Sequence, residues 1–190
     1  MNVQHVKAKI FARESSGIDL GEAIPVFHQW IQKNSGEELL IDVADYRHVP
    51  GGPGVMLIGH DAHWSLDSAR NRLGLVYNRR TAMEGSTGEK LRQAVGAALE
   101  ACRRLEQEAP FRGKLVFDGG ECEIAINDRL LAPNTEETYR ALKSDFEWLF
   151  DALWGPGAYT MEHAGEAREL FQVVGKARTP VAAAELALAP

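Results

Sequence analysis

Histidine and carboxylate side chains are concentrated in one stretch of the sequence. The residues that can transfer protons or bind metal ions there are Asp42, Asp45, His48, His60, Asp61, His63 and Asp67. Imidazole nitrogens and carboxylate oxygens are ligands that zinc and iron take in proteins. The stretch therefore predicts either a metal site with His60 and His63 as ligands, or the polar ends of a hairpin.

Strand geometry limits which of these residues can meet. If the apolar segments on either side of the Gly-Pro loop pair as a hairpin, His48 lies at one end and His60 at the other. Six residues along a strand span roughly 20 Å at ~3.4 Å per residue. His60 and His63 are closer, but positions at that spacing on a strand point to opposite faces. Only a bend at Gly59 or Asp61 would direct both imidazoles to one ion.

Other polar residues stand where a ligand could bind. Asp42 interrupts the apolar segment ELLIDVADY, predicted to be a central strand, and a buried carboxylate needs a partner, such as Arg129, or a raised pKa. Arg79 and Arg80 precede a predicted helix start, where they either bind an anion or are ordinary surface arginines. The predicted ligand-binding residues are Asp42, His48, Arg79, Arg80, Asn127 and Arg129.

Signatures of several common protein classes do not occur in the sequence. The segment HVPGGPG lacks the Gly-Lys-Ser/Thr of a nucleotide-binding P-loop, and its prolines remove backbone donors. The sequence contains no nucleophile elbow, zinc-protease motif or dinucleotide fingerprint, and it indicates no particular cofactor. The formal charge of −6, from 21 Lys and Arg against 27 Asp and Glu, argues against broad binding to nucleic acid or an anionic membrane.

Hydrophobic periodicity predicts the helices that must position these residues. A helix is expected from Ile24 to Lys33. Two more are expected after the capping patterns that begin at Ser86 and Asn134, each with a glutamate three residues later. The helix after Ser86 has the clearest apolar stripe, which includes Cys102. Cys102 and Cys122 are therefore expected to be reduced, buried thiols.

Alternating apolar and polar residues predict the strands. Val6 to Ala12 reads as a half-buried strand, and the segment KLVFDGGECEIAIND reads as a hairpin turning at Gly119-Gly120. The segment AHWSLD either continues the strand before it or pairs back on it. RLGLVYNRR is a further strand, and AYTMEH and ELFQVVGK are expected to be two closing strands.

The order of these elements predicts an α+β fold, with about three helices packed on one or two mostly antiparallel sheets. A helix–strand–strand order occurs three times in this interpretation. Residues 1–176 are expected to form a single domain, because this length can bury a substantial core. Residues 177–190 form an Ala-rich tail, expected to be disordered or a frayed helix.

The segments LLIDVADYRHVPGGPGVMLIGHDAHWSLD, GLVYNRR and INDRLLAPNT together resemble an uncharacterised family of bacterial hypothetical proteins. The resemblance covers most of the chain from the first strand to the third helix. It implies a bacterial, cytoplasmic protein and transfers no catalytic residues. The sequence also has no signal peptide and no apolar run long enough to span a bilayer, which favours the cytoplasm.

Two functions are compatible with these observations. The first is a non-catalytic module that binds a small molecule or a protein partner, expected to be a homo-oligomer such as a homodimer, with no nucleic-acid or membrane partner. The alternative is a metal-dependent enzyme that uses Asp42, His48, His60 and His63.

Overall fold

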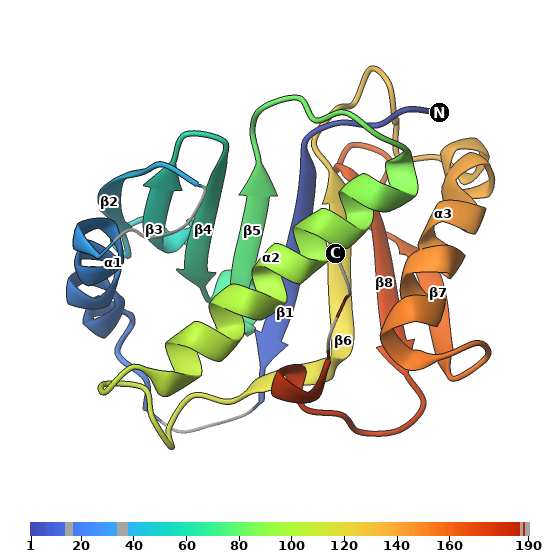
Figure 1. Cartoon of the computed structure of the whole chain (residues 1–190). Coiled ribbons are helices and arrows are strands. Elements are labelled where there is room, and N and C mark those ends of the chain that lie inside the picture. The colour runs from blue at the N-terminus through green and yellow to red at the C-terminus, as the bar shows by residue number, and fades with distance from the viewer. Residues whose placement is uncertain (14–16, 34–37, 187, 189–190) are drawn as a thin grey trace.

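One antiparallel sheet forms the centre of the fold (Figure 1). The computed structural model describes residues 1–13, 17–33, 38–186 and 188. Within them, eight strands pair in the order β2-β3-β4-β5-β1-β6-β8-β7. Their bounds are β1 Val6–Ala12, β2 Leu40–Tyr46, β3 Gly54–Gly59, β4 Ala62–Asp67, β5 Gly74–Arg79, β6 Phe117–Ile126, β7 Tyr159–Ala164 and β8 Phe171–Ala177. The α+β class expected from the sequence is confirmed.

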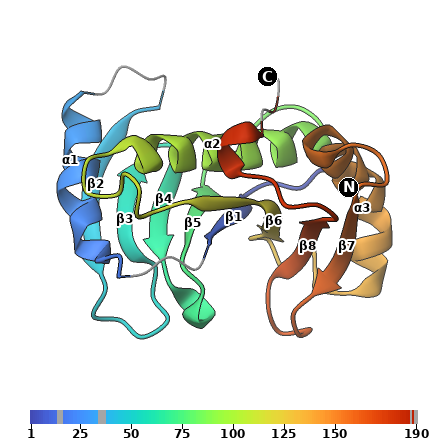
Figure 2. The same ribbon diagram turned by 90° about the horizontal axis from the view of Figure 1, so that it is seen from below.

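The α-helices cover one face of this sheet. They are α1 Ala23–Gln32, α2 Thr87–Gln107 and α3 Glu136–Trp154, and short 3-10 turns lie at Leu20–Glu22, Ala69–Asn71 and Ala183–Glu185. α2 crosses β5 and β1 diagonally, while α1 packs on β2, and α3 on β7 and β8 (Figure 1). Seen along the strands, the helices lie on the outside of a curved sheet (Figure 2). None of the described helices combines the length and apolar character needed to cross a bilayer.

Local sequence signals account for the helix starts. Ser86 accepts a hydrogen bond from the Glu89 amide and the Glu89 carboxylate accepts one from the Ser86 amide, so the predicted capping box is present. The predicted cap at Asn134 is wrong by one residue, because Thr135 caps α3. The Asn134 amide instead donates to the carbonyls of Ala164 and Glu166, which ties the start of α3 to β7.

The predicted hairpin at Gly119-Gly120 is wrong, because both glycines lie inside β6. The register of β6 against β1 shifts there: Ile10 pairs with Cys122, whereas Ala12 pairs with Phe117. A Cβ on Gly119 would lie 2.7 Å from the Ala182 backbone, so a glycine is needed for close approach rather than for a turn. Only one strand follows α2, so the threefold helix–strand–strand order is also wrong.

The structure decides two points about strand positions. AHWSLD forms β4 and pairs back on β3. ELLIDVADY, expected to be central, contains β2, and β2 stands first in the strand order, at an edge of the sheet. The apolar character of β2 had indicated burial on both faces, but only one of its faces packs on α1.

The C-terminal segment 177–190 takes part in the core where it is described. Ala183 and Leu186 are 0% and 7% exposed, and the turn between them packs on α2 and β6. Residues 187, 189 and 190 lie outside the described residues. Cys102 and Cys122 are buried free thiols, as expected, and burial raises the pKa of both.

Candidate ligand site on the open face of the sheet

The face of the sheet that the helices do not cover is called here the open face, and some of its side chains are buried from solvent. Val6, Ala8 and Ile10 of β1 pack into the helix-covered core, so Lys7, Lys9 and Phe11 point to the open face. Lys9 and Phe11 are nevertheless only 5% and 4% exposed. Burial of a lysine on this face requires a cover and a partner.

The cover is the β4–β5 connection, residues 68–73, which is called here the strap. Its Arg70 guanidinium donates to both carboxylate oxygens of Glu123, at 2.9 and 3.1 Å. Arg72 donates to both oxygens of Glu121, at 2.9 and 2.7 Å. Because Glu121 and Glu123 belong to β6, the strap passes over β1, and the Arg72 guanidinium lies 3.6 Å from the centre of the Phe11 ring.

The strap holds an unfavourable backbone conformation in order to do this. Arg70 and Asn71 have φ of 58° and 56°, in the left-handed region. Asparagine adopts this region more readily than most residues, whereas arginine is strained in it. The ion pairs to β6 and the hydrogen bonds of the Lys9 ammonium and the Asp67 carboxylate to the strap backbone hold the strap against the open face.

A hollow of about 80 Å³ lies between the strap and the open face. It is lined by Lys7, Lys9, Phe11, Asp67, Ala69, Arg70, Arg72 and Glu123. Lys9 is paired with Asp67 at 2.5 Å, and each arginine is paired with a glutamate of β6. Within the described part of the chain, Lys7 has neither an ion pair nor a hydrogen bond, so the hollow has one cation in excess.

Charge pairing around the strap shifts pKa values. The Arg72 guanidinium holds the pKa of Glu121 below its usual value, and Glu121 in turn raises the pKa of Arg72. Further along the open face, burial lowers the pKa of His63, and the nearby Arg80 lowers it further.

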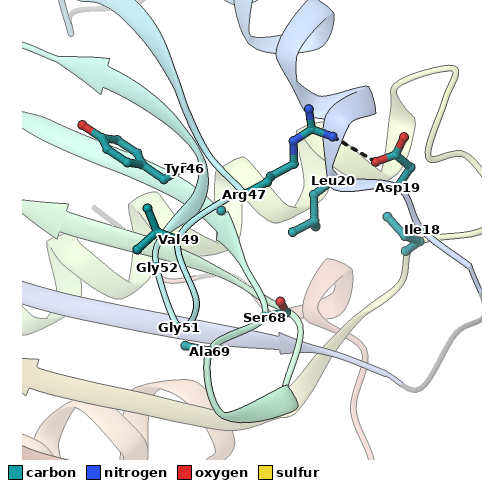
Figure 3. A pocket seen from close by; sticks show the side chains of 11 residues that line it. Ile18, Asp19, Leu20, Tyr46, Arg47, Val49, Gly51, Gly52, Ser68 and Ala69 are labelled. Atoms are coloured by element: carbon teal, nitrogen blue, oxygen red, sulfur yellow. Dashed lines mark hydrogen bonds and ion pairs between the residues drawn. The ribbon is translucent and has the colours of Figure 1, made fainter.

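A second hollow, of about 200 Å³, borders the strap residues Ser68 and Ala69 (Figure 3). Arg47 extends from the end of β2 toward Asp19 in this hollow (Figure 3). The guanidinium also donates to both carboxylate oxygens of Asp45, at 2.9 and 2.8 Å, and lowers the pKa of Asp45 to about 2. Its charge is already satisfied, which makes this hollow the poorer candidate for an anion.

The predicted ligand-binding residues do not converge. Asp42 is exposed on β2, where its carboxylate accepts from the Val43 amide, and Arg129 is not its partner. His48 is exposed in the β2–β3 connection beside the Tyr46 ring. Arg79 and Arg80 lie at the end of β5, near Asp61. Asn127 and Arg129 are exposed after β6.

The predicted metal ligands do not form a centre either. His60 and Asp61 form the tight connection between β3 and β4, and His60 is exposed. His63 lies two residues into the strand, half-buried on the open face. Among the residues that the structure describes, no three His, Cys, Asp or Glu side chains are placed to hold a metal ion together.

Sequence reasoning missed the residues of the strap hollow. Lys7 and Lys9 alternate with buried apolar residues, a pattern that indicates a solvated face. The signal that could have marked them is the short connection SARNR between two strands, which carries two arginines and follows Asp67. That these arginines reach β6 depends on β1 lying between β5 and β6 in the sheet.

Comparisons with known proteins identify no relative: no family model, curated protein or solved structure matches this chain. The candidate site therefore stands on its geometry alone.

Proposed function

We propose that this chain is a binding module for a small anionic molecule, carrying a carboxylate or a phosphate, at the strap hollow. The observation that supports this most directly is Lys7, whose ammonium has no acidic partner among the described residues, in a hollow where every other cation has one. A charge-assisted hydrogen bond to such a group contributes ~1.5–3 kcal/mol.

The strap also offers a way for the site to adjust to its ligand. The Arg70 side chain is 68% exposed and is held by its contact with Glu123. It can turn from Glu123 to a bound anion without disturbing the core, and the planar guanidinium suits carboxylate and phosphate oxygens. Lys9 and Asp67 form the fixed floor of the site, because both are buried. A cytoplasmic location and self-association are parts of the same proposal, and both derive from the sequence.

Thermal unfolding in sodium phosphate, sodium acetate and sodium chloride of equal ionic strength tests the proposal. A ligand that binds only the folded chain raises its stability by RT ln(1 + [L]/Kd), ~2.7 kcal/mol at a hundredfold excess over Kd. We expect phosphate or acetate to raise the unfolding midpoint above that in chloride. Lys7→Gln should remove most of this increase.

The matched control is Lys114→Gln, which removes the same charge from the exposed turn before β6. It should keep the full response, because salts that act by exclusion from the protein surface stabilise all variants alike. Equal responses in both lysine variants, or no difference among the three salts, would contradict the proposal.

A further inference from the structure

A row of residues, polar except for one alanine, continues from the strap hollow across the open face. Strand register places His63 opposite Asn78, Asn78 opposite Lys7, Lys7 opposite Ala125, and Ala125 opposite Gln172. Directly paired residues share a face of the sheet, so these five form one line across β4, β5, β1, β6 and β8. We call this line the polar row. Lys7 belongs both to the row and to the hollow.

Unsatisfied hydrogen-bonding atoms are concentrated in this row. Within the described residues, the buried side-chain atoms without a partner are His63 Nδ1, Asn78 Oδ1 and Gln172 Nε2, and all three belong to the row. Gln172 is only 6% exposed. Buried polar groups are nearly always paired, so three unpaired atoms on one line of one face require an explanation. A ligand that pairs with them is the explanation that also accounts for Lys7.

The spacing of the row excludes a very small ligand as the only partner. Neighbouring strands lie ~4.8 Å apart, so the three spacings from Asn78 to Gln172 cover ~14 Å. The two side chains offer opposite chemistry, because Asn78 Oδ1 is an acceptor and Gln172 Nε2 is a donor. Their terminal torsions are soft, so each amide can turn its unpaired atom toward the open face at low cost.

We infer that the ligand is an extended peptide of about six residues with an acidic side chain near its middle. Main-chain N–H and C=O groups recur along an extended chain and can satisfy Asn78 and Gln172. The acidic side chain reaches Lys7, which lies between them in the row. Val76 and Val174 lie two positions along β5 and β8, on the same face of the sheet, and both are buried, at 3% and 8% exposure. The inference rests on the proposed anion site.

An array of blocked hexapeptides tests this inference. One central position carries Glu, Gln or Lys, the flanking positions are varied, and the labelled full-length protein is the probe. We expect Glu-centred members to retain wild-type protein best, and Lys7→Gln to abolish that preference. Fluorescence anisotropy with the best Glu-centred peptide should then show at least tenfold weaker binding for Asn78→Leu and for Gln172→Met.

Misfolding does not confound the two amide variants, Asn78→Leu and Gln172→Met, because each removes an unpaired buried group, and their unfolding midpoints should equal or exceed that of the wild type. Their response to inorganic phosphate should be unchanged. If phosphate binds at Lys7 but no peptide is retained, or if the amide variants bind the peptide as the wild type does, the peptide inference is overturned. If phosphate and peptides both fail to bind, the anion site itself fails.

Discussion

At the scale of single residues, the Lys9–Asp67 pair is the most constrained interaction of the site. Both side chains are almost completely buried, at 6% and 7% exposure. The Lys9 ammonium also donates to the Arg72 carbonyl, and Asp67 accepts from the Ala69 amide. Two buried charges are tolerated only when they are paired and hydrogen-bonded, so this pair fixes the start and the end of the strap.

Removal of one partner of this pair should be costly. We expect Lys9→Met to lower the free energy of unfolding by ~3–5 kcal/mol, because Asp67 would remain buried and uncompensated. The double variant Lys9→Met/Asp67→Leu should be clearly more stable than the sum of the single variants predicts, by denaturant titration. The exposed Lys143–Glu147 pair is the control and should show a smaller coupling. Additive effects at Lys9 and Asp67 would show that the pair is not the anchor.

Residue types alone could not distinguish this site from solvated surface. The density of histidine and aspartate drew attention to His60 and His63, yet among the described residues no three His, Cys, Asp or Glu side chains are placed to hold a metal ion together. The site instead uses lysines on a strand and arginines in a short connection. Their burial arises from contacts between β1, the strap and β6, which are distant in sequence.

At the scale of elements, the strap depends on the ionisation of Glu121. Its pKa is lowered in the folded chain, chiefly because its carboxylate accepts hydrogen bonds from Arg72. A lowered folded pKa adds stability above the unfolded value, which is 4.5 for a glutamate, and that stability is lost as the pH falls through the folded pKa. Acid should therefore weaken the attachment of the strap.

Glu121→Gln isolates this effect. The variant should be less stable than the wild type at pH 7, and the difference should shrink as the pH falls below 4.5, measured by denaturant unfolding across that range. Glu100→Gln, which removes an exposed contact with Arg103, should show a smaller difference at pH 7. A difference between Glu121→Gln and wild type that is constant with pH would contradict the role given to this carboxylate.

Elements with strong local signals were predicted well from the sequence. The capping box at Ser86 and the apolar stripe of α2 are examples, since both depend on neighbouring residues. β6 was predicted wrongly, because Gly119-Gly120 is a common turn signal. A glycine is needed at position 119 because the Ala182 backbone lies close to it, and Ala182 is more than sixty residues further along the chain. The helix cap at Thr135 instead of Asn134 has a similar origin, because the Asn134 side chain donates hydrogen bonds to the carbonyls of Ala164 in β7 and of Glu166 after it.

At the scale of the whole molecule, strand order could not be deduced from periodicity. β1 pairs with β5 on one side and β6 on the other, so the first strand becomes central and β2 becomes an edge. Natural edges are usually protected by lysine, proline or a bulge. β2 has a register shift between Leu40 and Asp42 and two exposed aspartates, but its sequence LIDVADY contains neither lysine nor proline. Leu39 and Ile41 are 60% and 54% exposed beside it.

This exposed edge should pair with a second copy of the chain, in line with the homodimer expected from the sequence. We expect sedimentation velocity at micromolar concentrations to show a reversible dimer, and Ile41→Lys to shift it toward monomer, because a charge on the edge opposes strand addition. Leu130→Lys is the control: Leu130 is 99% exposed but lies after β6, away from the edge, so the same change there should leave the dimer intact. A monomeric wild type, or equal effects of the two lysines, would show that β2 is not the interface. The open face lies on the same sheet, so a dimer joined at β2 would extend it into one continuous surface carrying two strap hollows.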